Sequence, residues 1–467
     1  MKSSEMLDFN KLISSKRLST LNCGYVLEIE KADEKYNKIR TPFQRDYDRI
    51  IFSQAFRRLG GKTQVHPLSD NDSIHTRLTH SLETASVGRS LGLMVGDYLK
   101  KEQLIDDKIE VNDIATILQS ACLAHDLGNP PFGHAGEYAI ANWFKEFFNK
   151  NKGFPLDDEF KKEFEVFDGN AQGFRLVNKL ENNFLKGGMN LTITTLSTMI
   201  KYPHFAKQNQ ENKFSIFMTE EKESDLIFNE LGLKYVRSDS AEQNYLRHPL
   251  SYLMEAADDI CYVFLDLVDA IDLELIEFED VLPFYKEAIK NDVKVNKVVS
   301  DSNLKFTRKA SRLTAYAINE LTLCLGNIFI NNIKRFTNKS EVIKISSLID
   351  LDLDIKKIIK DIKNFSKENI FSEKNKSRLE IAAYKILGDL LEIFVNAIYE
   401  LDNNDEENLS YKNKNILNLM GKYKPQKSVS LYEKLRLVVD FISGMTDRYA
   451  TMLFQQLNGM SFQFKRL

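Results

Sequence analysis

The amino-acid sequence predicts an all-α protein with at most a small β-hairpin, on three observations. Prolines are few, nine among 467 residues, so little interrupts a helix. Apolar residues recur three and four positions apart along most of the chain, which is the spacing of one helix face. Stretches with the strict alternation of a half-buried strand are hard to find. The composition, 43% hydrophobic and 28% charged, is typical of a soluble globular protein with a large core.

The individual elements follow from local signals along the chain. Asn112 is a suitable N-cap for a helix that begins at Asp113. Glycine and proline in LGNPPFG, residues 127–133, predict a loop. A hairpin is expected around Lys213–Thr219, and polar stretches predict exposed loops over 149–162 and 402–414. Helices are predicted over residues 46–59, 79–99, 113–125, 136–148, 248–273 and 379–401.

The net charge and its distribution along the chain limit the classes of binding partner that the sequence predicts. The net charge of −3 gives no overall attraction to nucleic acid or to a membrane. Residues 35–62 nevertheless contain eight basic residues against two acidic ones. Such a local excess can hold an anion such as a polyphosphate, and a solvated helix face is the alternative interpretation.

No targeting or membrane segment is expected from the sequence. Residues 1–10 mix charged and apolar side chains and lack the apolar core of a signal peptide. No stretch of about 18 uncharged apolar residues occurs, so we expect no membrane span. The four cysteines are far apart and form no CxxC pair, which predicts no disulfide framework and fits a reducing cytoplasm. Cys122 and Cys261 stand in apolar runs and are expected to be buried.

Histidines and aspartates at three places in the helical pattern predict a metal site. His80 stands in RLTHSLETA, His125 and Asp126 in ACLAHDLGNPPFGHAGE, and Asp258 with Asp259 in SYLMEAADDICYVFLDLVDAI. An aspartate inside an apolar helix is costly unless it is paired or binds a metal. One divalent cation would explain both Asp126 and the pair Asp258–Asp259. For Asp258–Asp259, a helix cap or a buried salt bridge is the alternative. Two imidazoles with two carboxylates suit Mn²⁺, Fe²⁺, Ni²⁺ or Zn²⁺, and Mg²⁺ less well.

This ordered set, a His, then His-Asp, then Asp, resembles the metal-binding signature of the HD phosphohydrolase superfamily. More narrowly, the chain resembles the bacterial deoxyguanosinetriphosphate triphosphohydrolases (dGTPases). HDLGNPPFGHAGE, residues 125–137, is the most specific segment. Gly60–Gly61 is a small departure, because relatives often carry Gln-Gly there, and it leaves the local loop shape open. The other matching segments are RTPFQRDYDRIIFSQAFRRL (40–59), KTQV (62–65), TRLTHSLETA (76–85), KYP (201–203), YLMEAADDICY (252–262) and DFISGMTDRYA (440–450).

The resemblance implies a mainly helical HD-domain fold. It implies hydrolysis of dGTP to deoxynucleoside and inorganic triphosphate by attack of water on the α-phosphorus, and it leaves open whether other dNTPs are substrates. It divides the chain into an N-terminal extension, residues 1–39, an HD-type catalytic domain, 40–275, and a C-terminal helical region, 276–467, that packs on the catalytic domain. A cytoplasmic homo-oligomer, hexamer or tetramer, is expected. Regulation by single-stranded DNA or by a dNTP effector is left open.

The resemblance also implies roles for individual residues. Mn²⁺ or Mg²⁺ is the expected metal, and Fe²⁺, Ni²⁺, Zn²⁺ and Co²⁺ are further candidates. His134 is expected to act as general acid or proton shuttle, with Glu137, three residues later on one helix face, as its orienting partner. Asp258 is preferred over Asp259, whose expected role is a contact to the ligands. The expected metal ligands are His80, His125, Asp126 and Asp258, and the expected substrate contacts are Gln64, Val65, Arg77, Lys201, Tyr202, Lys213, Tyr262 and Asp266.

Two other functions compete with the triphosphohydrolase. One is another HD phosphohydrolase, such as a 5′-nucleotidase or a cyclic-nucleotide phosphodiesterase. The other is a non-catalytic protein that binds dNTPs or nucleic acid and has kept the fold. The complete set of metal ligands together with His134 and Glu137 favours an enzyme.

Overall fold

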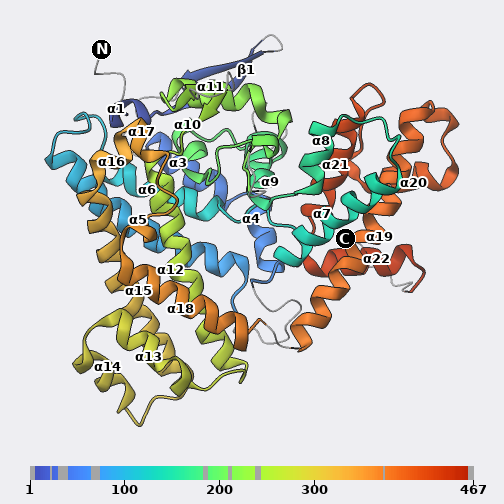
Figure 1. Cartoon of the computed structure of the whole chain (residues 1–467). Helices are drawn as coiled ribbons and strands as arrows, with labels where there is room; N and C mark the ends of the chain where they lie inside the picture. Colours follow the sequence, from blue (N-terminus) through green and yellow to red (C-terminus); the bar gives the residue numbers. More distant parts are fainter. Residues whose placement is uncertain are drawn as a thin grey trace.

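The computed structural model describes residues 6–21, 24–29, 40–64, 74–181, 188–208, 213–236, 243–371 and 374–460. Within these ranges the protein is built mostly of helices, with two small two-stranded sheets. The predicted all-α fold is therefore confirmed. Figure 1 shows two groups of helices side by side, one around α5, α6 and α12 and the other around α19 to α22.

The two sheets are antiparallel hairpins. β1 (Lys16–Leu21) pairs with β2 (Gly24–Ile29), and β3 (Lys234–Val236) pairs with β4 (Gln243–Tyr245). The main helices, in chain order, are α1 (Phe9–Leu12), α3 (Pro42–Ile51), α4 (Gln54–Arg58), α5 (Arg77–Lys101), α6 (Val111–Ala124), α7 (His134–Lys150), α8 (Asp158–Glu165), α9 (Gly169–Arg175), α10 (Ile193–Met199), α11 (Glu221–Glu230), α12 (Pro249–Asp272), α13 (Phe278–Ile289), α14 (Asp292–Val299), α15 (Phe306–Asn331), α16 (Ile333–Thr337), α17 (Lys339–Val342), α18 (Leu353–Asn369), α19 (Lys374–Asn403), α20 (Tyr411–Leu419), α21 (Leu431–Ser443) and α22 (Asp447–Leu457).

Helices α5, α6 and α12 pack against one another in the first group. The Thr76 side chain caps the start of α5 by accepting from the Thr79 N–H. Near the middle of α5, a Cβ at Gly92 would lie 2.5 Å from the Cα of Ala115 in α6. A side chain at that position would therefore force the two helices apart. Their close packing brings His80 near the C-terminal end of α6, where His125 lies.

The structure corrects the prediction of one continuous helix over residues 46–59. α3 ends at Ile51, and Ser53 begins the separate helix α4. The Ser53 hydroxyl accepts from the Phe56 N–H at 3.1 Å. Serine side chains compete with the helix for backbone groups and favour a new N-cap, which apolar spacing alone does not register.

The prediction of a hairpin at Lys213–Thr219 is wrong. Ile216 forms only an isolated parallel bridge to Phe205, and the hairpins lie elsewhere in the chain. Phe214, Ile216 and Phe217 are fully buried, so the apolar run reflects core packing. The expected loops are shorter than predicted as well, because α7 runs to Lys150 and residues 149–162 and 402–414 contain parts of α8 and α20.

Two clusters of buried apolar side chains form the core. The first includes residues of α5, α6, α12 and α15 and extends to Ile370. The second joins α7 and α8 to α19, α21 and α22. Residues after 275 thus contribute to both clusters, and the expected division of the chain at residue 275 stays a prediction. Cys122 and Cys261 are buried and unpaired, as expected.

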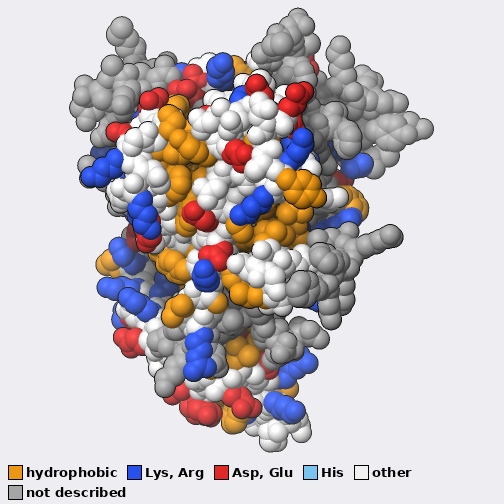
Figure 2. Space-filling model, turned by 90° about the vertical axis from the view of Figure 1, so that its right-hand side faces the viewer, with side chains coloured by type: hydrophobic (Ala, Val, Ile, Leu, Met, Phe, Trp, Pro, Cys, Tyr) orange, Lys and Arg blue, Asp and Glu red, His pale blue; other side chains and the backbone are white. Residues whose placement is uncertain are grey.

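The described residues contain one helix that is long and apolar enough to cross a membrane, α15. One such helix is weak evidence for a span, because a core helix of a soluble protein passes the same test. Leu313, Leu321 and Phe329 of α15 pack in the first core cluster. On the side of the second group, apolar side chains lie between charged ones on the surface (Figure 2). Exposed apolar residues of α19 and α20 include Ile381, Tyr399, Tyr411 and Leu419.

Candidate active site

Two histidines converge on one aspartate between α5, α6 and α12. The Nε2 atoms of His80 and His125 lie 2.9 and 3.4 Å from the same oxygen, Oδ1 of Asp258. Potential ligand atoms of these three residues lie within 4.8 Å of one another. Residues up to 178 positions apart in sequence are thereby brought to one point.

The donor set fits a divalent metal ion. Nδ1 of His125 lies 2.6 Å from the Cys122 carbonyl oxygen, so this nitrogen donates its proton there and Nε2 is left with a lone pair for a metal. Burial alone would raise the pKa of Asp258, but the two imidazoles lower it well below its ordinary value. Asp258 is therefore ionised, as a metal ligand must be.

Asp126 lies beside this group and not within it. Its Oδ1 is 3.6 Å from Nε2 of His125, and its Oδ2 accepts from Nη1 of Arg77 at 2.7 Å. Asn129 donates to the other oxygen. Burial raises the pKa of Asp126, but Arg77 and the imidazoles outweigh it and lower the pKa. Its expected role as fourth ligand stays a prediction.

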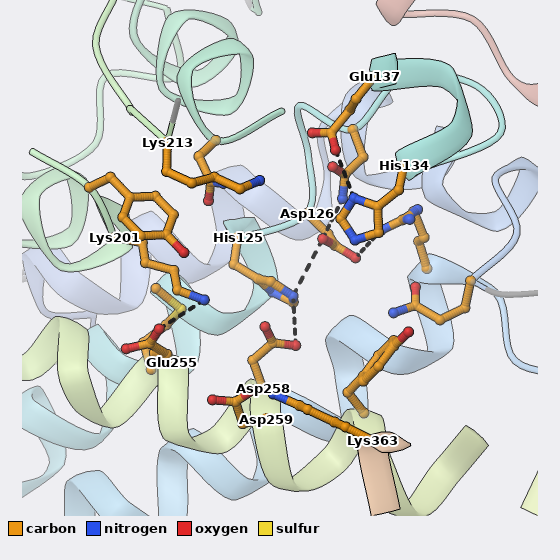
Figure 3. Close-up of a pocket in the computed structure, with 17 residues that line it drawn as sticks. His125, Asp126, His134, Glu137, Lys201, Lys213, Glu255, Asp258, Asp259 and Lys363 are labelled. Carbon is orange, nitrogen blue, oxygen red and sulfur yellow. Dashed lines mark hydrogen bonds and ion pairs between the residues drawn. The ribbon is translucent and has the colours of Figure 1, made fainter. Parts of the chain in front are cut away.

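Asp259 points to a different partner. Its Oδ1 accepts from Nζ of Lys363, on α18, at 2.7 Å. Figure 3 shows Asp258 facing His125 while Asp259 turns toward Lys363. Burial raises the pKa of Asp259 despite this lysine. The geometry favours Asp258 as the ligand.

His134 and Glu137 form a pair at the start of α7. Nδ1 of His134 lies 2.7 Å from Oε2 of Glu137, and Oε1 of Glu137 accepts from the Gly169 N–H at 2.7 Å. The carboxylate is buried, whereas the imidazole is largely exposed to the cavity and solvent. The hydrogen bond and the charge of Glu137 raise the pKa of His134.

One cavity of about 370 Å³ is lined by residues of both groups, although His80 itself is buried behind the lining. Its lining includes His125, Asp126 and Asp258 together with His134 and Glu137. In Figure 3 the pair lies at the upper right and Lys201 and Lys213 lie at the left, with His125 near the centre and Asp258 below it. Potential metal ligands, the His134–Glu137 pair and the lysines therefore line a single cavity.

Comparison with known proteins agrees with this geometry. Residues 77–184 match the HD domain family and residues 349–456 match the phosphohydrolase-associated domain family. A deoxyguanosinetriphosphate triphosphohydrolase-like protein of Pseudomonas aeruginosa is 40% identical over 90% of this chain and 94% of its own length. A protein of the same name from Synechocystis sp. is 36% identical over 97% of this chain and all of its own length. A Klebsiella pneumoniae protein named deoxyguanosinetriphosphate triphosphohydrolase is 28% identical over 89% of this chain and 93% of its own length.

The chain belongs to the deoxyguanosinetriphosphate triphosphohydrolase-like family of HD-domain proteins. It is a phosphohydrolase by family. The segment 125–137, which carries the resemblance in the sequence, lies inside the matched HD domain.

Among the described residues of this family member, four cationic side chains line the cavity, namely Arg77, Lys201, Lys213 and Lys363. Arg77 is buried at the first turn of α5. Lys201 pairs with Glu255 at 2.9 Å, and Lys213 lies 3.7 Å from Asp168. Burial lowers the pKa of both lysines, but these carboxylates outweigh it and raise the pKa. Both lysines are therefore charged at neutral pH and suited to phosphate oxygens.

The remaining expected substrate contacts are spread more widely. Gln64, Tyr202 and Tyr262 line the cavity. Asp266 is buried and does not line it. Burial raises the pKa of Tyr262, and the charge of Asp266 and its hydrogen bond with the Tyr262 hydroxyl raise it further. Val65 lies outside the described residues.

Several lining residues were not predicted from the sequence. Asn129 lies within the most specific segment, so its position could have been found there. Lys363 comes from α18, about a hundred residues after Asp258 in a helix with many lysines, and nothing in its local sequence singles it out. The unpredicted lining residues are Asn129, Asn170, Met254, Glu255 and Lys363.

Proposed function

We propose that this protein hydrolyses deoxynucleoside triphosphates, dGTP first among them, to deoxynucleoside and inorganic triphosphate. The observation that carries the proposal is the single cavity that holds His125, Asp258, His134 and cationic side chains. The printed name of the Klebsiella relative supports dGTP as substrate. Water attacks the α-phosphorus, the bond from that phosphorus to the 5′-oxygen breaks, and the 5′-oxygen leaves with a proton.

His80, His125 and Asp258, with Asp126 beside them, would hold the divalent cation. Mn²⁺ and Mg²⁺ are the preferred candidates, and Fe²⁺, Ni²⁺, Zn²⁺ and Co²⁺ suit the imidazoles as well. Such a cation polarises phosphate oxygens and lowers the pKa of a bound water. Asp126 also holds Arg77 in the cavity through the 2.7 Å ion pair.

His134 supplies the proton for the departing 5′-oxygen. The hydrogen bond to Glu137 and the charge of that carboxylate raise the pKa of His134, which favours the protonated imidazole, the form that an acid catalyst needs. Glu137 fixes the ring by accepting from Nδ1, so that Nε2 carries the transferable proton. Gly169 in turn holds the Glu137 carboxylate in place.

The cationic side chains bind the triphosphate. Arg77, Lys201 and Lys213 carry the positive charge that three phosphate groups require. Tyr262 would lie against the sugar, with Asp266 holding its hydroxyl, and Gln64 and Val65 would contact the sugar and base. Tyr202 lies next to Lys201, whose Nζ is 5.5 Å from the centre of the tyrosine ring.

A product assay tests the proposal. The full-length protein is incubated with each of the four dNTPs in Mn²⁺ and in Mg²⁺, and phosphate products are separated. Inorganic triphosphate from dGTP supports the proposal. Orthophosphate or pyrophosphate points to another HD phosphohydrolase, and dNTP binding without turnover points to a non-catalytic protein.

A histidine variant tests the proton donor in the same assay. His134→Ala should retain Mn²⁺ binding and lose on the order of 10²–10⁴ in turnover. Calorimetry measures the Mn²⁺ affinity separately. A loss of that affinity would make His134 a ligand instead.

We further propose a cytoplasmic homo-oligomer, hexameric or tetrameric, and regulation by a dNTP or by single-stranded DNA as an added property. Exposed apolar residues of α19 and α20 favour a contact between copies. Lys62, one of the basic residues of the stretch 35–62, is buried. The stretch therefore supports nucleic-acid binding less strongly than its count of basic residues alone indicates. Light scattering, and a salt-dependent mobility shift with single-stranded DNA, test these points.

A further inference from the structure

The loop between α6 and α7 has an unfavourable backbone conformation next to the catalytic pair. Phe132 has φ of +65° and Gly133 has φ of +58°. A residue with a side chain seldom adopts this region unless its surroundings hold it there. This loop sets where α7 begins, and so where His134 stands.

The carboxylate of Asp447, the first residue of α22, holds this loop. Oδ1 of Asp447 accepts from the Phe132 N–H at 2.9 Å. Its Oδ2 accepts from the backbone N–H and the hydroxyl of Thr63, at 3.1 and 2.9 Å. The side chain is buried. One carboxylate therefore joins the segment before His134 to the segment before Gln64.

A buried lysine makes the complementary contact. Nζ of Lys62 donates to the carbonyl oxygen of Asn129 at 2.5 Å and to that of Ser443, the last residue of α21, at 2.8 Å. A Cβ at Gly61 would lie 2.8 Å from Cγ2 of Thr446. Residues 61–63 thus lie directly against the turn between α21 and α22.

The turn is itself anchored to the catalytic pair by a second route. Asp440 of α21 accepts from the Arg175 guanidinium at 2.7 Å and from Gln172 at 2.8 Å. Both donors lie on α9, and the first residue of α9 is the Gly169 that binds Glu137. Helix α9 therefore connects α21 to the carboxylate that orients His134.

These contacts join the two halves of the site. His80, His125 and Asp258 stand on helices of the first core cluster. His134 and Glu137 stand on α7, whose apolar residues belong to the second cluster with α19 to α22. The distance between the metal ligands and the proton donor is therefore set where the clusters meet.

We propose that Asp447 and Lys62 are positioning residues, which hold the 126–133 loop so that His134 faces the group of His80, His125 and Asp258. The C-terminal helices α21 and α22 are in this sense part of the catalytic apparatus. The inference rests on the proposed function for its kinetic consequences. Its structural consequence, a Phe132 amide kept in place by Asp447, does not depend on the substrate.

The experiment compares Asp447→Ala with Glu433→Ala in the full-length protein. Glu433 caps α21 at its exposed start and does not contact the loop, so its variant controls for weakening of the C-terminal helices. Hydrogen exchange at the Phe132 amide, the Mn²⁺ affinity by calorimetry, and kcat and KM for dGTP are measured for each.

For Asp447→Ala we expect rapid exchange at Phe132 and a fall in kcat of roughly 10- to 100-fold. The Mn²⁺ affinity and KM should change less than about threefold, because His80, His125 and Asp258 stand on α5, at the end of α6 and on α12, outside this loop. Glu433→Ala should retain the Phe132 protection and the kcat. Thr63→Val, which removes one of the three hydrogen bonds, should give a smaller effect in the same direction and serves if Asp447→Ala does not fold.

Two further results would test the inference and the proposed function separately. Full protection of Phe132 together with a kcat within twofold of the parent in Asp447→Ala would overturn the inference. If the parent protein releases no triphosphate from any dNTP, the proposed function fails, and the exchange at Phe132 still decides whether Asp447 holds the loop.

Discussion

Nδ1 of His134 lies 2.7 Å from the carboxylate of Glu137, and the far oxygen of that carboxylate is held by the backbone of Gly169. The exposed imidazole is thus attached to a buried anion with a fixed orientation. The anion favours the imidazolium, so the pKa of His134 is raised, which suits the role of proton donor proposed for it. The rings of His80 and His125, in contrast, are almost fully buried.

The pH dependence of turnover should report this pair. The pKa of His134 is raised by Glu137, so the protonated form persists to higher pH, and kcat should fall only as the pH rises through the raised pKa. Glu137→Gln removes the charge, and the falling limb should move to lower pH, toward the ordinary value of 6.5. Steady-state kcat between pH 5 and 10 measures the limb, with Glu146→Gln on the exposed face of α7 as control. An unmoved limb in Glu137→Gln would contradict the assignment.

Metal affinity should distinguish two adjacent aspartates. Asp258→Asn removes the negative charge of the carboxylate that both imidazoles approach, so Mn²⁺ affinity should fall by more than about 100-fold. That loss is larger than the loss expected when a residue that only contacts a ligand is changed. Asp259→Asn removes only the partner of Lys363, and the affinity should stay within about threefold of the parent. Calorimetric titration with Mn²⁺ provides the comparison. Equal losses in the two variants would mean that the ligand set is wrong.

Two glycine variants should differ in their effect on the site. Gly133→Ala places a methyl group 2.6 Å from Nη2 of Arg77 at a residue with φ of +58°, so it should move the loop or the guanidinium. We expect kcat/KM for dGTP to fall on the order of 10²-fold. Gly153→Ala is the matched control, because its Cβ would meet no atom within 4 Å. Similar kinetics for both variants would show that the loop tolerates displacement.

Stability should fall in mild acid because of His248. Its Nδ1 accepts from the Leu250 N–H at 3.2 Å, its Nε2 lies 3.3 Å from the Leu12 carbonyl oxygen, and the ring is fully buried. Burial lowers its pKa from 6.5 to about 4. Since the unfolded chain takes up this proton below about pH 6.5 and the folded protein does not, the free energy of unfolding should decrease as the pH falls from 6.5 toward 4, by up to about 3 kcal/mol.

Urea unfolding at pH 7 and pH 5 measures this loss. His248→Asn keeps an N-cap acceptor for α12 and removes the titrating ring. The difference in unfolding free energy between the two pH values should therefore be smaller in the variant. An unchanged difference would place the acid sensitivity elsewhere in the protein.

The helical class could be predicted from the amino-acid sequence, and so could most of the residues of the candidate site that line the cavity. Helical spacing is a local property, so α6 and α12 are predicted within a few residues of their observed ends. His80, His125 and Asp258 are recognisable only as an ordered set, a His, then His-Asp, then Asp, which resembles the signature of the HD superfamily. Where a local polar contact outweighs the spacing, as at Ser53, or where an apolar run only fills the core, as at Ile216, the prediction fails.

Which of these residues lie close together, and which contacts hold them there, depends on how the helices pack. Helical spacing alone does not separate Asp258 from Asp259, which the resemblance ranks, and the packing of α12 turns the first toward His125 and the second toward Lys363. Asp447 reaches Phe132 across 315 positions of sequence. A contact over such a separation depends on how whole helices pack, and no local pattern encodes it.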